Sequence, residues 1–173
     1  MITASDLHAI LPHATGANID RYWQPLNDAM DAFGINTPIR QAMFLAQVGH
    51  ESGSLTYVRE IASGEAYEGR SDLGNNQPGD GRKFKGRGLL QCTGRANYQA
   101  CGDALGVDLI SEPDLLETPE LAAMSAGWFW QSRGINELAD TGNIQKVTRR
   151  VNGGLNGLAE RTAIWERAKA QLC

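Results

Sequence analysis

Apolar residues recur at intervals of three and four along much of the chain, which is the spacing of one face of an α-helix. Over residues 19–33 the repeated positions are Trp23, Leu26, Met30 and Phe33. Gly34 ends this pattern, because glycine weakens a helix and often follows its last turn. We therefore expect a helix over residues 19–33.

A second helix is expected to begin at Pro38 and to end near Glu51. Asn36 and Thr37 precede the proline, which is favoured in the first turn of a helix. The positions that should face the core are Ile39, Ala42, Met43 and Ala46. Ser52 and Gly53 supply the stop, and Gly53 can adopt the left-handed conformation that ends many helices.

Three more helices are expected in the last third of the chain. The first begins at Thr118-Pro119-Glu120 and ends at Gly134, with an inward face made of Leu121, Met124, Trp128 and Phe129. The second covers residues 143–151 and is broken by Gly153-Gly154. Asn156 is expected to cap the third, which runs to the C-terminus and has Leu158, Trp165 and Leu172 at compatible spacing.

The segment from Gly64 to Gly88 is predicted to be a loop, because it contains seven glycines and few apolar repeats. Before it, residues 55–59 alternate in polarity, so a small sheet is expected around residues 55–60 and 84–92. The chain of 173 residues suits one domain and contains no internal repeat or linker. We predict a mainly α, single domain over residues 1–173.

The composition is that of an ordinary globular protein, with 42% hydrophobic and 21% charged residues. The net charge of −4 gives no overall indication of nucleic-acid binding. Residues 64–95 are nevertheless locally basic and could face an anionic polymer or simply form a solvated loop surface. No membrane span or secretory signal is apparent. Three cysteines without paired spacing are typical of reduced thiols.

Glu51 and Glu60 lie nine positions apart and carry the candidate chemistry. Hydrolysis of a glycosidic bond needs two carboxyl groups in different environments, one that donates a proton and one that stays ionised. Glu51 would lie in the last turn of its helix, where the helix dipole disfavours a negative charge, as suits a general acid. Glu65 and Glu68 lie in the following loop and could supply the second carboxylate instead of Glu60.

Four motifs occur in an order that resembles the glycoside hydrolase family 19 chitinases. They are Gly49-His50-Glu51-Ser52-Gly53, Tyr57-Val58-Arg59-Glu60, Gly86-Arg87-Gly88-Leu89-Leu90-Gln91-Cys92-Thr93, and Val151-Asn152-Gly153-Gly154-Leu155-Asn156-Gly157 with Arg161. The run Asp72-Leu73-Gly74-Asn75, followed by Gln77-Pro78-Gly79-Asp80-Gly81, is more similar to the phage endolysin branch of that family. The resemblance covers roughly residues 38–165.

The resemblance implies a bilobal, lysozyme-like helical fold with a small β element, and inverting hydrolysis of β-1,4 bonds between N-acetylated sugars. In an inverting enzyme the two carboxyl groups lie ~6.5–9.5 Å apart. The implied catalytic residues are the general acid Glu51, the base Glu60 and the water-holding Thr93. The implied sugar-binding residues are Gln91, Asn97 and Asn152. Arg161 would brace the acidic pair, and His50 would pack as a hydrogen-bonded neighbour.

Two positions depart from the family pattern. Ala96 stands where chitinases often carry a substrate-contacting tyrosine, and Cys92 replaces an aliphatic residue and is expected to be a small core residue. Trp128 and Trp130 could stack on sugars, although helix aromatics more often pack in a core. With only three histidines, no metal site and no cofactor are expected.

The leading hypothesis is a phage-type endolysin, a muramidase that binds and cleaves peptidoglycan glycan strands. It would act as a monomer, without a separate wall-binding module or stable membrane association. It would be made in the host cytoplasm and reach the periplasm through a holin-type lesion. The alternatives are a chitinase of the same family, a non-catalytic wall-binding module and a lytic transglycosylase.

Overall fold

The computed structural model describes residues 1–173, and it is built almost wholly from helices. The α-helices are α1 (Ala4–Ile10), α2 (Gly16–Ala32), α3 (Pro38–Glu51), α4 (Asp80–Lys83), α5 (Arg95–Leu105), α6 (Pro119–Ser132), α7 (Ile135–Asp140), α8 (Ile144–Asn152) and α9 (Leu158–Leu172). The short 3-10 helices are η1 (Glu65–Tyr67), η2 (Ser71–Leu73) and η3 (Pro113–Glu117). The expected small sheet is reduced to two isolated bridges, which pair Arg87 with Arg59 and with Cys92. The predicted mainly α fold is confirmed.

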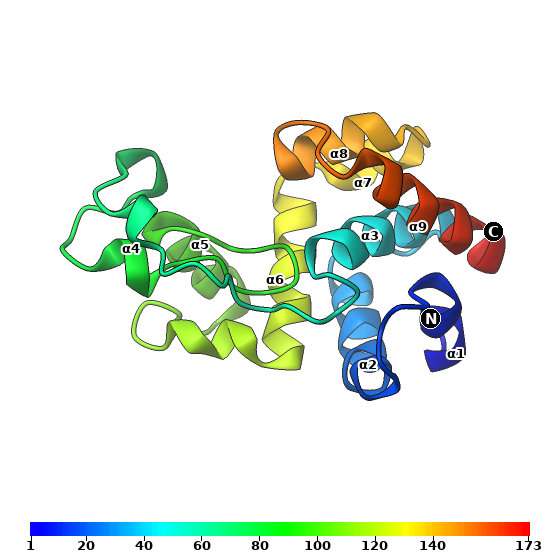
Figure 1. Cartoon of the computed structure of the whole chain (residues 1–173), viewed down its shortest axis with the longest axis horizontal. Helices are drawn as coiled ribbons and strands as arrows, with labels where there is room; N and C mark the ends of the chain where they lie inside the picture. The colour runs from blue at the N-terminus through cyan, green and yellow to red at the C-terminus, as the bar shows by residue number, and fades with distance from the viewer.

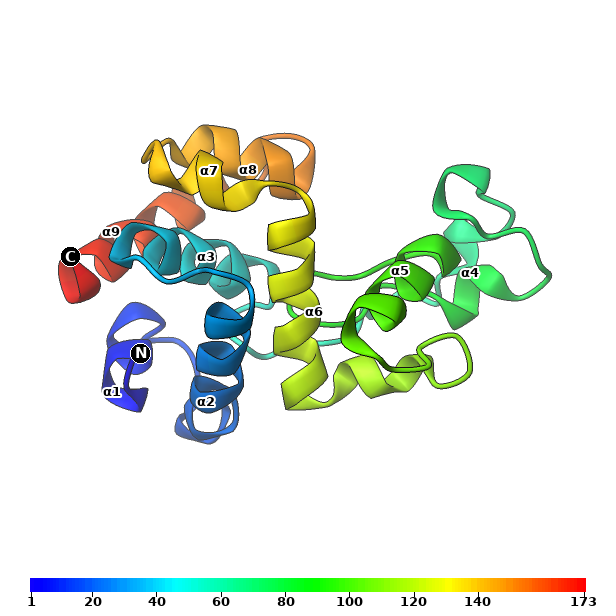
Figure 2. The same cartoon turned by 180° about the vertical axis from the view of Figure 1, so that it is seen from behind.

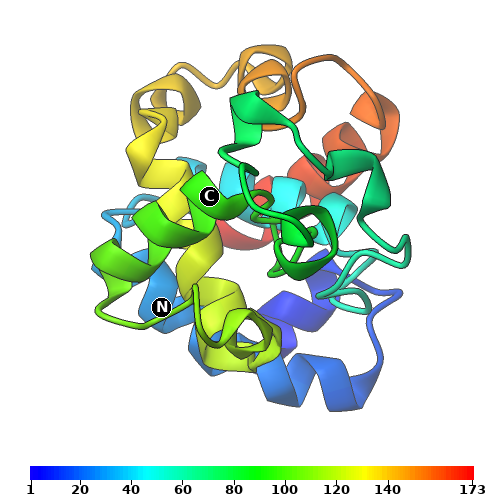
Figure 3. The ribbon, with the colours of Figure 1, turned by 90° about the vertical axis from the view of Figure 1, so that its left-hand side faces the viewer.

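The helices form two lobes of unequal size (Figures 1 and 2). In the larger lobe, α1, α2, α3, α7, α8 and α9 surround a hydrophobic core to which α6 also contributes. The smaller lobe contains α4, α5 and the loops around them, with a core of six buried residues. Figure 3 looks along the molecule from the smaller lobe, whose green segments lie in front of α3 and α9. The bilobal arrangement implied by the family resemblance is therefore present.

Helix α6 joins the lobes because it is apolar around most of its circumference. Ala122, Ala126 and Trp130 lie in the larger core, whereas Leu121 and Trp128 pack against the smaller one. All four residues of the predicted inward face pack against a core, Met124 and Phe129 against the larger one and Leu121 and Trp128 against the smaller one, but none of them is fully buried. A helix buried on two sides has no single apolar stripe, and its periodicity therefore cannot identify the fully buried residues.

Helix α3 has the predicted bounds and end signals. The Thr37 hydroxyl accepts a hydrogen bond from the backbone N–H of Arg40, Pro38 lies in the first turn, and Gly53 adopts φ +55°. The small sheet expected from residue 55 onward does not begin there, because Ser54 and Leu55 also adopt positive φ values of 56° and 66° within a turn. The buried Ser52 hydroxyl stabilises this tight turn by accepting a hydrogen bond from the Leu55 N–H at 2.9 Å.

Several local expectations were wrong for simple physical reasons. Helices α1, α5 and α7 were not predicted, and the supposed loop of residues 64–88 contains η1, η2 and α4. These elements are short, so few apolar repeats mark them. Helix α9 is preceded by Gly157 and not by a capping Asn156, whose backbone carbonyl instead accepts a hydrogen bond from Arg161.

Ion pairs order the segment between residues 64 and 95. Arg82 pairs with Glu65, Arg70 with Asp72, and the Arg95 guanidinium with both oxygens of the buried Asp80. Most of the local positive charge is therefore neutralised within the lobe, which favours a structured surface over a site for an anionic polymer.

None of the nine helices is long and apolar enough to span a membrane. All three cysteines are free thiols, with Cys92 and Cys101 buried in the smaller core.

We predict that Asp80→Asn lowers the free energy of unfolding by about 3 kcal/mol at pH 7, because it removes one partner of a buried pair. The Arg95 guanidinium holds the pKa of the Asp80 carboxyl below its ordinary value. The ionised pair therefore stabilises the fold above the unfolded-state pKa of about 4, and this contribution is lost as the pH falls through the lower folded-state pKa. Urea denaturation should show the difference between wild type and variant shrinking below about pH 4.

Asp72→Asn is the matched control, since Asp72 and Arg70 are both exposed. Exposed pairs contribute little to stability. Equal destabilisation by the two substitutions would contradict a structural role specific to Asp80.

Candidate active site

Glu51 is held at the end of α3 by a buried arginine. The Arg161 side chain is 0% exposed, and its Nη2 donates to Glu51 Oε1 at 2.5 Å. Its Nη1 donates to Gln47 Oε1 at 2.6 Å, and its Nε donates to the Asn156 carbonyl at 3.0 Å. A buried guanidinium needs such acceptors. Glu51 is 22% exposed, so its carboxyl group is fixed yet still reaches the surface.

Glu60 is held on the segment that bridges to the smaller lobe. Its backbone N–H donates to the Gly86 carbonyl at 2.8 Å. Its side-chain Oε2 accepts from the Gly86 N–H at 3.0 Å, and Oε1 accepts from the Tyr67 hydroxyl at 3.0 Å. Both oxygens act as acceptors, as an ionised carboxylate requires.

Gly86 is the point where three candidate side chains converge. A Cβ added there would lie 2.4 Å from Gln91 Oε1, 3.2 Å from Glu60 Oε2 and 3.3 Å from Thr93 Oγ1. Glu60 lies about thirty positions before Gln91 and Thr93 in the sequence, yet all three side chains come together beside the α-carbon of Gly86. Any larger residue at position 86 would displace at least one of them.

The turn that presents Gln91 and Thr93 is strained. Gln91 has φ +53°, which is uncommon for a residue other than glycine, and its Nε2 donates to the Gly88 carbonyl at 3.2 Å. The Thr93 hydroxyl donates to the Gln91 carbonyl at 3.0 Å, and Asn97 Nδ2 donates to the Thr93 carbonyl at 2.8 Å. Strain of this kind often occurs at functional sites.

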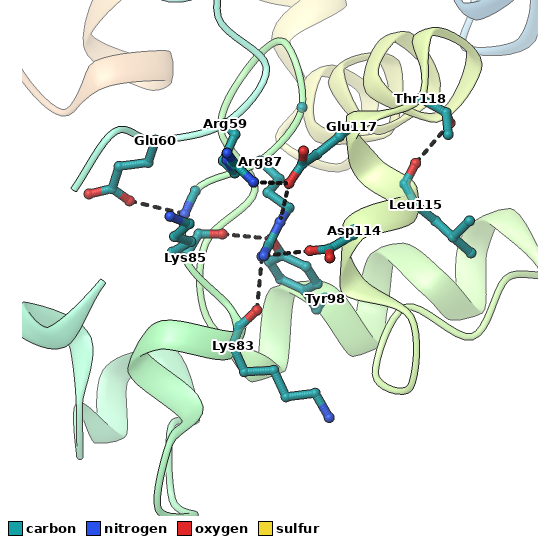
Figure 4. Close-up of polar contacts among 12 residues, drawn as sticks. Arg59, Glu60, Lys83, Lys85, Arg87, Tyr98, Asp114, Leu115, Glu117 and Thr118 are labelled. Atoms are coloured by element: carbon teal, nitrogen blue, oxygen red, sulfur yellow. Dashed lines mark hydrogen bonds and ion pairs between the residues drawn. The ribbon is translucent and has the colours of Figure 1, made fainter. Parts of the chain in front are cut away.

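A second buried arginine anchors this turn (Figure 4). Arg87 Nε donates to Glu117 at 2.9 Å, Nη2 pairs with Asp114 at 2.7 Å, and Nη1 donates to Lys83 O at 2.8 Å and to Tyr98 Oη at 3.0 Å. The Tyr98 hydroxyl in turn donates to Lys85 O at 2.6 Å. Burial raises the pKa of Tyr98, so this phenol stays neutral and can donate. The contacts fix the segment on both sides of Gly86.

The two alternative carboxylates are engaged elsewhere. Glu68 accepts from the N–H groups of Gly79 and Gly81 at 2.7 and 2.8 Å, and Glu65 pairs with Arg82. Both contacts fold the loop onto itself. The structure therefore favours Glu60 as the second carboxylate.

The remaining predicted residues lie apart from this cluster. His50 Nδ1 lies 2.7 Å from Glu160 Oε2, and its ring packs so closely on Gly157 that a Cβ there would lie 2.1 Å from it. Asn152 ends α8 as an exposed residue without a side-chain hydrogen bond. Arg161 contacts Glu51 and does not contact Glu60.

Two cavities adjoin the converging side chains. One of about 410 Å³ is lined by residues 56–61 together with Lys85 and Glu117. Another of about 160 Å³ is lined on one side by Gln91, Thr93 and Asn97. Trp128 also lines the second cavity, whereas Trp130 is buried in the larger core and donates to Asn136 at 2.9 Å.

The structure contains no group of three or more His, Cys, Asp or Glu side chains that could hold a metal ion.

The family model for class I chitinases of glycoside hydrolase family 19 matches residues 36–142. A Haemophilus influenzae protein described as a glycosyl hydrolase family 19 domain-containing protein is 32% identical, over 95% of this chain and 94% of its own length. The chain belongs to glycoside hydrolase family 19. It is therefore a chitinase-like glycosidase, and Glu51, Glu60 and the Gly86 turn all lie within the matched segment.

Chitinases from plants and bacteria are also similar to this chain. An Arabidopsis thaliana endochitinase is 40% identical over 65% of this chain, which spans only 39% of that protein. The crystal structure of a bacterial family 19 chitinase superposes with a TM-score of 0.82 at 26% identity, covering 99% of this chain and 94% of the other. Chitinase C from Streptomyces griseus HUT6037 shares the fold, with a TM-score of 0.80 at 24% identity over 99% of this chain and 76% of its own.

Sequence reasoning missed the residues that hold this family 19 site together. Gln47 is completely buried one helical turn before Glu51, and a polar residue within an apolar helix face was the available signal. Tyr67 and Glu117 gave no comparable signal, because their contacts with Glu60 and Arg87 depend on how distant loops fold.

We predict that Tyr67→Phe lowers kcat about tenfold and changes KM little, because Glu60 loses the hydroxyl that fixes its Oε1. The measurement is steady-state hydrolysis of a soluble glycan substrate. Tyr22→Phe is the control, since Tyr22 is buried in α2 without a side-chain hydrogen bond. Unchanged kcat in Tyr67→Phe would contradict a role for Tyr67 in positioning the carboxylate.

Proposed function

We propose that this family 19 protein is a muramidase of the phage endolysin type. It hydrolyses the β-1,4 bond between N-acetylmuramic acid and N-acetylglucosamine in peptidoglycan by an inverting acid–base mechanism. The main observation in support of this mechanism is a pair of carboxyl groups that are fixed by different hydrogen-bond partners. Glu51 is fixed by a buried arginine, and Glu60 by a backbone N–H and a tyrosine hydroxyl.

Glu51 is suited to donate the proton. Its Oε1 accepts from Arg161, whereas its Oε2 makes no hydrogen bond within the protein and can carry the acid proton. With the glycosidic oxygen placed beside Oε2, protonation would allow the bond to break with the electron pair leaving on the oxygen.

Glu60 and Thr93 are suited to hold the attacking water. Glu60 Oε2 and Thr93 Oγ1 both lie beside the α-carbon of Gly86, and the Thr93 hydroxyl already donates its proton to Gln91 O. Thr93 Oγ1 therefore offers a lone pair, and a water could donate one hydrogen to it and the other to Glu60. The oxygen lone pair of that water would remain free to attack the sugar.

The preference for peptidoglycan over chitin is supported by Ala96, an exposed residue beside the loop at Gly74 that stands where chitinases often carry a tyrosine. A Cβ at Gly74 would lie 2.8 Å from the Ala96 Cβ, and Asn75 Oδ1 accepts from the Arg95 N–H at 2.8 Å. A tyrosine at position 96 would have to find space beside this loop. Leu73 of the endolysin-like run also lines the cavity that contains Thr93 and Asn97.

A chitinase is the second candidate function, because plant and bacterial chitinases are among the relatives. Both substrates are β-1,4-linked strands of N-acetylated sugars, so the acid–base pair serves either. We further propose that the protein acts as a monomer on periplasmic glycan strands after release through a holin-type lesion. The three free thiols are compatible with folding in a reducing compartment before release.

We predict that Glu51→Gln and Glu60→Gln each lower the rate of lysis of outer-membrane-permeabilised Gram-negative cells by about a thousandfold, the scale of general acid or base catalysis. Glu51→Gln should fold like wild type, since the amide oxygen of the glutamine can still accept the hydrogen bond from Arg161. Glu65→Gln is the matched control and should retain activity. Retention of most activity by Glu51→Gln would contradict the assignment of Glu51 as the general acid.

Product analysis separates the candidate functions. Mass spectrometry of a peptidoglycan digest should show fragments that end in reducing N-acetylmuramic acid. Anhydro-muramic ends would indicate a lytic transglycosylase, and sedimentation with peptidoglycan without release of fragments would indicate a wall-binding module. Cleavage of chitin oligomers alone would favour the chitinase.

A further inference from the structure

One partly buried arginine beside the site lacks a partner for its charge. Arg133 follows α6 and lines the 160 Å³ cavity together with Gln91, Thr93 and Asn97. Its guanidinium makes no hydrogen bond or ion pair within the protein. The other arginines that are not exposed each donate to a carboxylate or a backbone carbonyl; they are Arg40, Arg87, Arg95, Arg161 and Arg167.

An unpaired, partly buried cation is unfavourable, because burial removes water without supplying acceptors. Burial accordingly holds the pKa of the Arg133 guanidinium below its ordinary value. The group remains charged under all physiological conditions. The folded protein thus keeps a partly desolvated positive charge beside residues of the candidate site.

The position of Arg133 is fixed by contacts on both sides. Its guanidinium carbon lies 3.7 Å from the centroid of the Phe129 ring, a cation–π stack that holds the planar group. Its backbone carbonyl accepts from Arg150 Nη1 at 2.7 Å. A stacked guanidinium keeps its edge free, and that edge can bind both oxygens of a carboxylate.

We propose that Arg133 binds a carboxylate on the lactyl or peptide branch of a muramic acid residue, and thereby selects charged glycan strands over chitin. This proposal rests on the muramidase function proposed above. Chitin carries no carboxylate, whereas muramic acid carries the lactyl branch, whose carboxyl group is free in stripped strands and bears the acidic stem peptide in intact ones.

The location of the cavity fits this role. Thr93 lines the cavity and also lies beside Glu60 Oε2 across Gly86. A branch that entered the cavity would therefore extend from a sugar close to the bond that is cleaved. A volume of about 160 Å³ corresponds to roughly five water molecules, at about 30 Å³ each, which is sufficient for a carboxylate and its adjoining carbon.

The test compares matched substrates that differ only in charge. Glycan strands stripped of peptide, and strands that retain it, are assayed before and after their carboxylates are converted to primary amides. In wild type, kcat/KM should be about tenfold higher for the charged strands, mainly through KM, and high salt should reduce the difference. In Arg133→Met, which can still pack on Phe129, the ratio should fall close to one.

Arg149→Met is the control, because Arg149 is an exposed cation on α8 and lies outside this cavity. It should keep the wild-type ratio. If only the stripped strands respond to Arg133→Met, the ligand is the lactyl carboxylate, and if only the peptide-bearing strands respond, it is a carboxylate of the peptide. An unchanged ratio, or equal losses on charged and amidated strands, would overturn the proposal.

A binding measurement separates this proposal from the muramidase function. N-acetylmuramic acid, which has a free lactyl carboxylate, and N-acetylmuramyl-L-alanyl-D-isoglutamine, which has a peptide carboxylate, are each titrated together with their amidated forms into Glu51→Gln and into the double variant with Arg133→Met. About tenfold tighter binding of the charged form, lost in the double variant, would support the role of Arg133 even if the enzyme cleaved only chitin. Equal affinities of the charged and amidated forms within both pairs in Glu51→Gln would overturn it even if the enzyme cleaved peptidoglycan.

Discussion

The guanidinium of Arg161 lies fully inside the larger lobe, and its need for acceptors constrains everything around the candidate acid. Glu51, Gln47 and the Asn156 carbonyl supply those acceptors, so one side chain joins both ends of the last turn of α3 to the segment before α9. A buried charge without these partners would be strongly destabilising. The fold and the position of the acid therefore depend on the same contact.

In the smaller lobe, a buried arginine likewise orders the segment around the second carboxylate. Arg87 is buried among Glu117, Asp114 and Tyr98, and it fixes the turn whose glycine, Gly86, donates to Glu60. Each carboxyl group is thus attached to its own buried cation, directly for Glu51 and through the backbone for Glu60. Helix α6 contributes to both cores and ends just before Arg133, so the same helix sets the spacing of the lobes and the place of the unpaired cation.

The sequence allowed α3 to be predicted residue by residue, because Thr37, Pro38 and Gly53 are local signals that act within one turn of the helix ends. It also singled out Glu51 and Glu60 and the turn that carries Gln91 and Thr93. The fully buried residues of α6 could not be predicted, because contacts with two cores erase a single periodicity. The contacts of Tyr67 and Glu117, and the lack of a partner for Arg133, depend on which distant segments meet in the fold. The spacing of residues along the chain does not predict such contacts.

We propose that Glu51 and Glu60 act on opposite sides of one sugar, with a water between Glu60 and the reacting carbon. Such an enzyme inverts the configuration at that carbon, whereas a covalent intermediate would retain it. Proton NMR of a fresh digest, recorded before mutarotation, measures this directly. If Glu60 activates a water in this way, the first product of the β-linked substrate is the α-anomer. An initial β-anomer would contradict this proposal, because Glu60 could then not activate water in a single displacement.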